Sequence, residues 1–233
     1  MPPAPDIAPR PLADGLWALE GAVVPWRMGV PMPLRTVVAR LGGGALWVHA
    51  PGPLTPDLAA WLEAEGRVAH LVVPAAPVLP WLGDWQSAYP RARLWRGEEL
   101  RDVPWRSYIR PLSCTGRDCE SVFLHHASRS VIVSRLMMAV ETEPLPPWAR
   151  PLVWLTGIDD SDGKPPPGLM RRVGGRSAVA DMVEQVLDWE PERLILTHGR
   201  CFERDAAGEL KRAMRRIMRD RLWDRALEEA KRR

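Results

Sequence analysis

The stretch from Ala45 to Val73 constrains the fold more than any other part of this chain. It contains two apolar runs of strand length, ALWVH and VAHLVV. The second run is nearly continuous, as in strands that are buried on both faces of a sheet. Between the runs, Thr55 can cap a helix that has Pro56 at its first position, and Gly66 can end that helix. Strand, helix and strand in this order indicate an α/β layer fold.

The rest of the chain carries further signals of the same kind. The Gly-Gly-Gly at 42–44 predicts a hairpin turn, because glycine adopts positive φ at little cost. We expect strands over 16–24, 35–41, 93–95, 121–125, 131–136, 152–156 and 193–196, helices over 82–88, 177–189 and 206–233, and loops over 102–118 and 158–168. The Pro-rich residues 1–15 are expected to form an extended arm. Residues 16–233 are then one domain that ends in a long, basic, amphipathic helix.

Amino-acid composition limits which partners and which cellular compartment we expect for the chain. The 233 residues are 46% hydrophobic and carry a net charge of only +3, which does not require an anionic partner. Nearly all basic residues are Arg and Asn is absent, which is typical of a GC-rich bacterial genome and weakens the case for nucleic-acid binding. No apolar stretch has the length of a membrane span. Three Cys and no apolar leader predict a cytoplasmic protein.

Histidines at strand ends are the first candidates for chemistry. His125 and His126 end one expected strand, and His198 follows another, before Gly199. Ligands and catalytic groups gather at strand ends along one edge of an α/β sheet. Two imidazoles are consistent with a zinc or iron site, but a catalytic zinc needs three protein ligands. Structural histidines are the alternative on spacing alone.

Three weaker candidates remain open. Asp159, Asp160 and Asp162 form a carboxylate cluster that suits a hard cation, or else a solvated turn. Cys114 and Cys119 could join the neighbouring histidines in a zinc site, although their spacing is looser than in structural zinc motifs. The arginines of the C-terminal helix could contact a nucleic acid, or they could simply be the solvated face of a packed helix.

Four segments together resemble a known family. They lie at 34–58 (LRTVVARLGGGALWVHAPGPLTPDL), 72–95 (VVPAAPVLPWLGDWQSAYPRARLW), 121–136 (SVFLHHASRSVIVSRL) and 187–199 (LDWEPERLILTHG). In this order they resemble a bacterial family of uncharacterised metallo-β-lactamase-like proteins, a domain of unknown function. The resemblance implies an αββα sandwich, two mixed sheets flanked by helices, with a site at one edge of both sheets. In the wider superfamily, His and Asp from strand ends bind one or two metal ions, which activate a water.

The metal-binding pattern of that family is mostly missing here. Ala75 stands where the family usually has Asn, and Val78 and Leu79 stand where it has a His pair. His125 and the final His198 match the pattern. The resemblance therefore implies that these two are the remaining candidate metal ligands.

The acidic ligand of the pattern is replaced by Arg135, which follows Ser134. A guanidinium about 4 Å from a dication, at an effective dielectric near 20, would repel it by on the order of 8 kcal/mol. We therefore expect no cofactor, and a pocket of His125, His126, Ser134, Arg135 and His198 that holds a small anionic ligand. The expected function is that of a non-catalytic or metal-free binding protein. The alternatives are a hydrolase of esters, lactones or phosphodiesters with one zinc or iron ion, and a protein that binds nucleic acid or a partner through its C-terminal helix.

Overall fold

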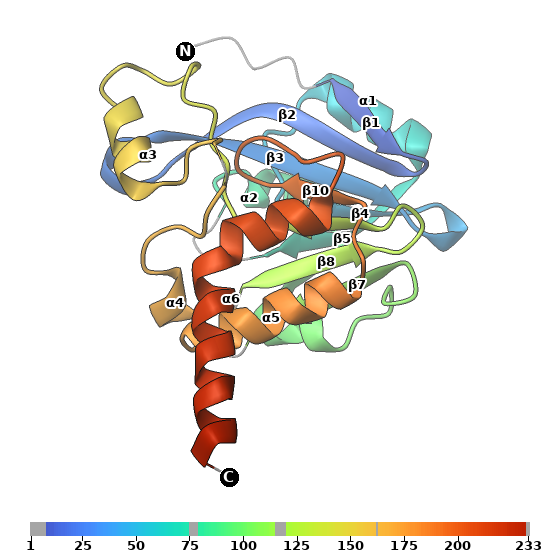
Figure 1. Cartoon of the computed structure of the whole chain (residues 1–233). Coiled ribbons are helices and arrows are strands. Elements are labelled where there is room, and N and C mark those ends of the chain that lie inside the picture. Colours follow the sequence, from blue (N-terminus) through green and yellow to red (C-terminus); the bar gives the residue numbers. More distant parts are fainter. Residues whose placement is uncertain (1–7, 75–78, 115–119, 162, 232–233) are drawn as a thin grey trace.

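The computed structural model describes residues 8–74, 79–114, 120–161 and 163–231, and within them ten strands form two sheets (Figure 1). The six-stranded sheet has the order β1 (Pro9–Ala13), β2 (Leu16–Pro25), β3 (Pro31–Arg40), β4 (Ala45–His49), β5 (Arg67–Val73) and β6 (Arg93–Arg96). The four-stranded sheet has the order β10 (Arg193–Leu196), β9 (Ser130–Val133), β8 (Ser121–His125) and β7 (Ile109–Ser113).

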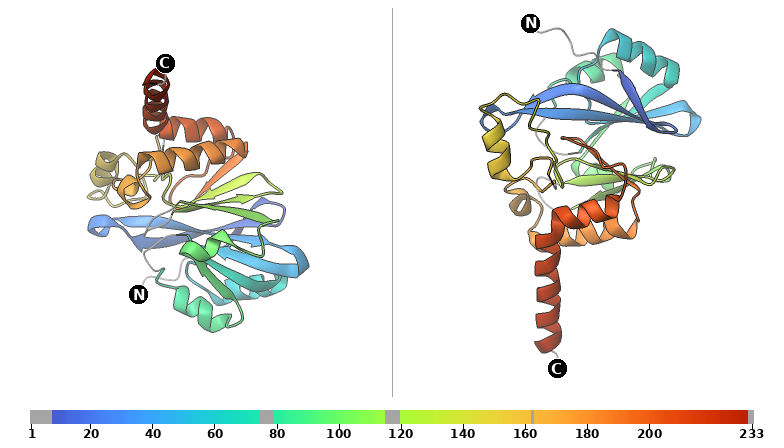
Figure 2. Two further views of the ribbon diagram at one scale, coloured as in Figure 1. Left: turned by 90° about the horizontal axis from the view of Figure 1, so that it is seen from below. Right: turned by 45° about the horizontal axis from the view of Figure 1, so that its top comes forward.

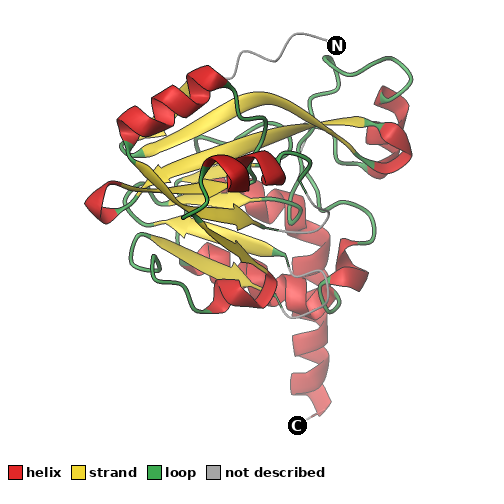
Figure 3. Cartoon of the chain, turned by 180° about the vertical axis from the view of Figure 1, so that it is seen from behind, coloured by secondary structure: helices red, strands yellow, loops and turns green. Residues whose placement is uncertain are grey.

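Helices cover the outer faces of both sheets. The first sheet carries α1 (Pro56–Glu65) and α2 (Leu82–Ala88), and the second carries α5 (Arg176–Asp188) and α6 (Ala206–Lys231) (Figure 2). Two short helices, α3 (Arg150–Thr156) and α4 (Leu169–Arg172), lie toward one edge of the layers, as the view from behind also shows (Figure 3). The order of layers is α, β, β, α, which confirms the predicted sandwich of two mixed sheets.

Aromatic side chains fill the space between the two sheets. Trp47 of β4 lies edge-on to Phe123 of β8, with ring centroids 5.4 Å apart, and to Trp105, at 5.7 Å. Trp95 of β6 packs on Trp105 in the same way, at 6.1 Å. All four of these rings are almost completely buried. Edge-to-face pairs stabilise beyond the area that they bury, so this cluster fixes how the sheets face each other.

Strand direction decides which strand ends share an edge. β4, β5 and β6 run parallel, and so do β9 and β10. β8 runs antiparallel to β9, with His125 opposite Ser130. The carboxyl ends of β4, β5, β9 and β10 therefore meet at one edge of the sandwich, and the carboxyl end of β8 lies at the other.

Three expected elements differ from the structure. Residues 152–156, expected as a strand, are helical in α3, because Pro151 suits a first helical turn and a run of four apolar residues fits either element. The expected loop 102–118 contains the strand β7. Within the expected arm, Pro9–Ala13 pair with β2 as the edge strand β1.

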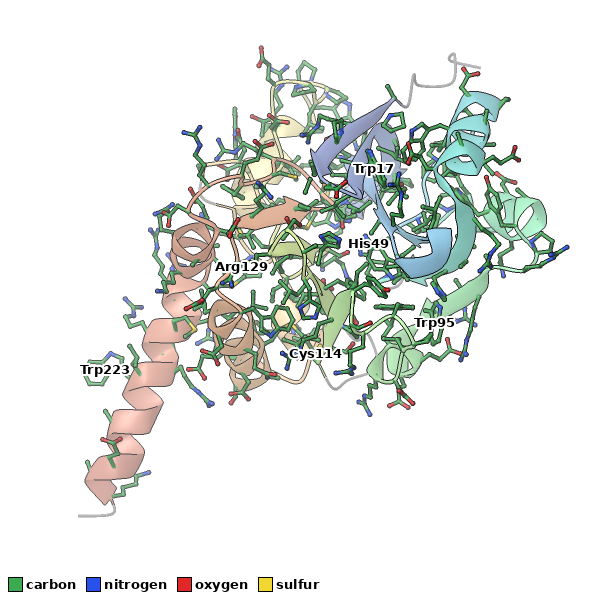
Figure 4. All side chains as sticks on the ribbon, turned by 90° about the vertical axis from the view of Figure 1, so that its right-hand side faces the viewer. Trp17, His49, Trp95, Cys114, Arg129 and Trp223 are labelled. Carbon is green, nitrogen blue, oxygen red and sulfur yellow. The ribbon has the colours of Figure 1, made fainter. Side chains whose placement is uncertain are left out.

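The apolar stripe expected on the C-terminal helix is buried only in its first half. Leu210, Met214 and Ile217 pack into the core beside α5, whereas Leu222 is 63% exposed. Beyond α5 the helix projects away from both sheets, and Trp223 stands on this projecting end (Figure 4). No helix in the described part of the chain combines the length and apolar character needed to cross a membrane.

We expect Thr55→Ala to lower the free energy of unfolding by about 1 kcal/mol. Thr55 Oγ1 accepts a hydrogen bond from the backbone N–H of Leu58 at 3.2 Å and so caps α1, as predicted. Thr55→Ser keeps the oxygen and is the matched control. Urea denaturation measures both variants, and an equal loss in both would mean that the cap bond does not stabilise the helix.

Candidate ligand pocket at the sheet edges

A pocket opens at the edge where the parallel strands end. Its volume is about 310 Å³, toward the lower end of the roughly 300–1,000 Å³ of small-molecule sites. The β2–β3 turn region, the segments after β4 and β5, and the segments after β9 and β10 all contribute to its wall. The described lining residues are Val24, Pro25, Trp26, Met32, Leu34, Ala50, Pro74, Leu79, Pro80, Ser134, Arg135, Met138, Thr197 and His198.

The polar side of the pocket is built from two adjacent strand ends. Ser134 and Arg135 follow β9, and Thr197 and His198 follow β10. The backbone N–H of Thr197 donates to the carbonyl of Val133 at 2.8 Å, which extends the parallel pairing into these segments. The hydroxyls of Ser134 and Thr197 hydrogen-bond at 3.1 Å. The remaining wall is largely apolar, so the pocket has one polar end.

Arg35 of β3 holds the segment after β10 in place. Its backbone N–H donates to the carbonyl of Thr197 at 2.8 Å, and its Nη1 donates to the carbonyls of Leu196 and, at 2.8 Å, of Gly199. The same guanidinium pairs with Glu20 at 2.9 Å. Burial acts to raise the pKa of Glu20, but its bonds to Arg35 outweigh this and lower it. Arg35 thus holds the segment after β10 in place, and it shares the Glu20 carboxylate with Arg10.

Arg135 is paired with a buried carboxylate. Its Nε lies 3.4 Å from Glu120 Oε2, and its backbone N–H donates to Glu120 Oε1 at 2.7 Å. The backbone N–H of Leu136 donates to the same Oε1 at 3.2 Å. Burial raises the pKa of Glu120 to about 7, although the Arg135 charge and these bonds act to lower it. Arg135 Nη2 is buried and has no hydrogen-bond partner among the described residues.

Two neutral imidazoles lie near this polar end. His198 Nδ1 is 2.8 Å from the carbonyl of Pro33, which sets the tautomer with the hydrogen on Nδ1. Burial lowers the pKa of His198 to about 4, and the charges of Arg135 and Arg35 act in the same direction. His49 lies between the sheets, stacked on Trp47, and neither of its ring nitrogens has a partner among the described residues (Figure 4). Burial lowers the pKa of His49 to about 3.

The structure separates two of the expected pocket residues from the other three. Ser134, Arg135 and His198 line one pocket. His125 and His126 lie at the start of β9, about 13 Å along the strand from Ser134 at the usual rise per residue. There, His125 Nδ1 bonds to Ser128 Oγ at 2.8 Å, and His126 is exposed. The hairpin between β8 and β9 is the physical reason, because it puts the end of β8 at the opposite edge.

The other candidates do not form a metal site in the described residues. No group of three or more His, Cys, Asp or Glu side chains converges anywhere in residues 8–74, 79–114, 120–161 and 163–231. Cys119 and Asp162 lie outside the described residues. Several arginines of α5 and α6 are engaged in ion pairs within the protein, such as Arg176 with Asp220 and Arg221 with Asp181.

Two residues of this region were missed in the sequence. His49 ends β4, at the same edge as the pocket, and the strand-end argument applied to His125 and His198 would also have found it. Glu120 had no local signal, because its partner Arg135 is fifteen residues away, in the segment after β9. The role of Glu120 depends on its ion pair with Arg135, which forms only when the sheet is folded.

A metal ion of the kind implied by the fold does not fit the described donors. His198 offers Nε2 and His49 is a second imidazole, but a catalytic zinc needs three protein ligands. Arg135 brings a permanent positive charge to the same pocket. Residues 75–78, which follow β5, have the sequence Ala-Ala-Pro-Val and carry no metal-binding side chain.

Comparison with known proteins places the fold. The metallo-β-lactamase DIM-1, in a crystal exposed to ceftazidime, superposes with a TM-score of 0.60 over 93% of this chain and 98% of its own, at 10% identity. A metallo-β-lactamase from Erythrobacter litoralis in a mono-zinc form gives 0.55 over 91% and 98%, at 14% identity. The metal-soaked Flv1 flavodiiron core from Synechocystis gives 0.61 over 92% of this chain and 61% of that one, at 11% identity.

These similarities define the class of protein but not its activity. No profile of a known protein family matches the sequence, and no curated protein sequence matches it either. At such low identities the structural matches show the fold alone. The chain is therefore an α/β protein with the metallo-β-lactamase fold, and its function has to be argued from the pocket itself.

Proposed function

We propose that the chain is a metal-free binding protein that holds a small anionic ligand in this pocket. The observation that carries the proposal is Arg135, which lines the pocket and whose Nη2 is buried without a hydrogen-bond partner among the described residues. A guanidinium has five N–H donors and stays charged at any working pH. A ligand carboxylate or phosphate oxygen would supply acceptors that the protein does not.

The neighbouring side chains favour an anion over a cation. The hydroxyls of Ser134 and Thr197 share one hydrogen bond, so one of their two hydrogens remains available to a ligand. His198 stays neutral at physiological pH because burial lowers its pKa to about 4. No Asp or Glu is among the described residues that line the pocket. The polar end therefore offers hydrogen-bond donors and the guanidinium of Arg135, which is also paired with Glu120.

Octanoate binding to chelator-treated protein tests this proposal. We expect calorimetry to detect binding, and Arg135→Gln to weaken it at least about tenfold, since a charge-assisted hydrogen bond contributes roughly 1.5–3 kcal/mol. Arg129→Gln is the matched control, because Arg129 pairs with Glu190 on the surface at the start of β9. Circular dichroism checks that each variant is folded.

Two results would overturn the proposal. One is equal octanoate affinity in Arg135→Gln and in the wild type. The other is stoichiometric zinc or iron in the purified protein that disappears in His198→Ala. The second result would mean that a metal ion, and not an organic anion, is what the pocket holds.

The alternative is a hydrolase with one metal ion, and one arrangement favours it. The segment 138–140 bridges to Gly199, next to His198, and also to Asp159. Gly199 and Asp159 thus pair with adjacent residues of one segment, which brings the backbone of the 159–162 loop near that of His198. This alternative predicts hydrolysis of an ester, lactone or phosphodiester panel that a chelator abolishes. Activity that is absent, or unchanged in excess chelator, would exclude it.

A further inference from the structure

The wall of the pocket indicates what kind of anion it can hold. Apart from the polar end, the described lining is apolar and includes Val24, Met32, Leu34, Leu79 and Met138. Burial of apolar ligand surface against such side chains is favourable in proportion to its area. The volume of about 310 Å³ is toward the lower end of the roughly 300–1,000 Å³ of small-molecule sites. The ligand that fits is therefore a small molecule with an apolar body and one charged end.

The charge of the pocket limits that end to a single negative charge. Arg135 is the charged group among the described residues that line the pocket, whereas Arg35 lies outside that lining and pairs with Glu20, and His198 is neutral. A doubly charged phosphate or a dicarboxylate would leave one charge without a counter-ion in an apolar cavity, which is costly. A monocarboxylate matches the one guanidinium, and its two oxygens can take two parallel N–H donors.

Glu120 already acts as an internal counter-ion to that guanidinium. The charged group that faces its carboxylate from the described residues is Arg135. Cys114 contacts the backbone of Glu120, whose N–H lies 3.2 Å from Cys114 Sγ. Residues 115–119, which include Arg117 and Asp118, lie outside the described residues. A ligand carboxylate that pairs with Arg135 would therefore share its one positive charge with the carboxylate of Glu120, whose side chain is only 1% exposed.

Two carboxylates that share one site do not both remain ionised when they are buried together, and one of them takes up a proton. Glu120 is the one placed to do so. Both backbone N–H groups donate to its Oε1, so Oε2 can carry the proton without losing those bonds. We propose that the pocket binds a small apolar monocarboxylate together with one proton, the carboxylate pairing with Arg135 and the proton residing on Glu120.

This inference rests on the proposed function, because it assigns the ligand class and its proton coupling to the same pocket. Burial already raises the pKa of Glu120 to about 7, so the proton is half bound at neutral pH before the ligand arrives. A ligand carboxylate, with a pKa near that of a glutamate at ~4.3, stays ionised above pH 6. Binding should therefore strengthen as the pH falls from 8 to 6, by about tenfold through linkage.

Calorimetry with octanoate, in two buffers of different ionisation enthalpy, tests the coupling on the wild-type protein. We expect uptake of close to one proton per octanoate at pH 8 and little uptake at pH 6, with binding about tenfold tighter at pH 6. Octanamide has the same chain without the charge, and suberate adds a second charge. Both should bind at least about tenfold more weakly than octanoate.

Glu120→Gln provides the matched variant. The amide oxygen can replace Oε1 and keep both backbone hydrogen bonds, so the variant resembles the protonated carboxyl. It should bind octanoate at pH 8 about as tightly as the wild type does at pH 6, with no proton uptake. Glu190→Gln changes an exposed glutamate that is also paired with an arginine, and it should keep the wild-type pH dependence.

The outcomes separate this inference from the proposed function. Octanoate that binds without proton uptake, or suberate that binds as tightly, overturns the inference and leaves an anion-binding pocket. Octanoate and suberate that both fail to bind at every pH overturn the proposed function as well. Proton uptake at pH 8 that disappears in Glu120→Gln supports both.

Discussion

The Gly199→Ala variant is expected to lose at least about 4 kcal/mol of folding stability, a loss among the largest for a single substitution. Gly199 has φ +100°, which L side chains rarely adopt, and an added Cβ would lie 1.9 Å from the carbonyl oxygen of Ala139 and 2.8 Å from the backbone nitrogen of Val140. Both neighbours are backbone atoms of a bridging segment, so neither can turn aside. The segments that follow β9 and β10 would have to separate at the bridge between Ala139 and Gly199.

Gly43→Ala is the matched control for this variant. Gly43 also has positive φ, at +68°, but nothing lies within 4 Å of an added Cβ. The folding stability lost in Gly43→Ala is therefore that of a left-handed backbone alone, roughly 1–2 kcal/mol. For a chain of this size, thermal denaturation should give a Tm roughly 10 °C lower for Gly199→Ala and a few degrees lower for Gly43→Ala. Similar Tm values for the two variants would mean that the bridge at Ala139 yields easily.

The same close approach explains why His198 lies where it does. Arg35 Nη1 donates to the carbonyl of Gly199, and the backbone N–H of Arg200 donates to the carbonyl of Ala139 at 2.8 Å. A side chain at Gly199 would disturb both bonds and move His198 with them. We therefore expect any folded Gly199→Ala protein to bind octanoate more weakly than Gly43→Ala does.

Local sequence signals predicted the elements that local chemistry determines. Thr55, Pro56 and Gly66 gave the bounds of α1, because capping, a fixed φ and a helix end are each set by one residue. The continuous run of β5 identified a strand that is buried on both faces. The run LVWLT has helix markers on both sides, Pro151 and Gly157, but its four apolar residues fit a strand equally well by their pattern. It forms a surface helix in which Leu155 is 86% exposed.

The pocket could be predicted only in part, because it depends on strand direction and on long-range pairs. Arg135 and His198 each lie two residues beyond a parallel strand, β9 and β10. The strand-end argument singled out His198, and the family resemblance singled out Arg135. His125 also ends a strand, but the expected hairpin to the next strand already implies that it lies at the opposite edge from Arg135. Glu120 could not be found, since its pairing with Arg135 exists only in the folded sheet.

Acid is expected to unfold the protein through His49, which is buried, and His198, which is partly buried. Burial lowers the pKa of His49 to about 3 and that of His198 to about 4, below the ordinary value of 6.5. The unfolded chain therefore binds protons below pH 6.5 that the folded chain does not, and stability present above that pH is lost as the pH falls. At pH 5 each histidine contributes a loss of about 2 kcal/mol. Urea denaturation midpoints at pH 7.5 and pH 5 measure the total loss of folding stability.

Protonation of Glu120 should oppose this loss of folding stability. Variants of Glu120 and of His49 should therefore change the acid loss in opposite directions. The folded pKa of Glu120, about 7, lies above the ordinary value of 4.5, so the folded state binds the proton first and gains about 2 kcal/mol between pH 7.5 and pH 5. Glu120→Gln should thus deepen the acid loss. His49→Leu should reduce it by a similar amount and cost little at pH 7.5, because neither ring nitrogen has a partner to lose among the described residues. If both variants and the wild type lost the same folding stability in acid, neither Glu120 nor His49 would have the pKa shift that its burial requires.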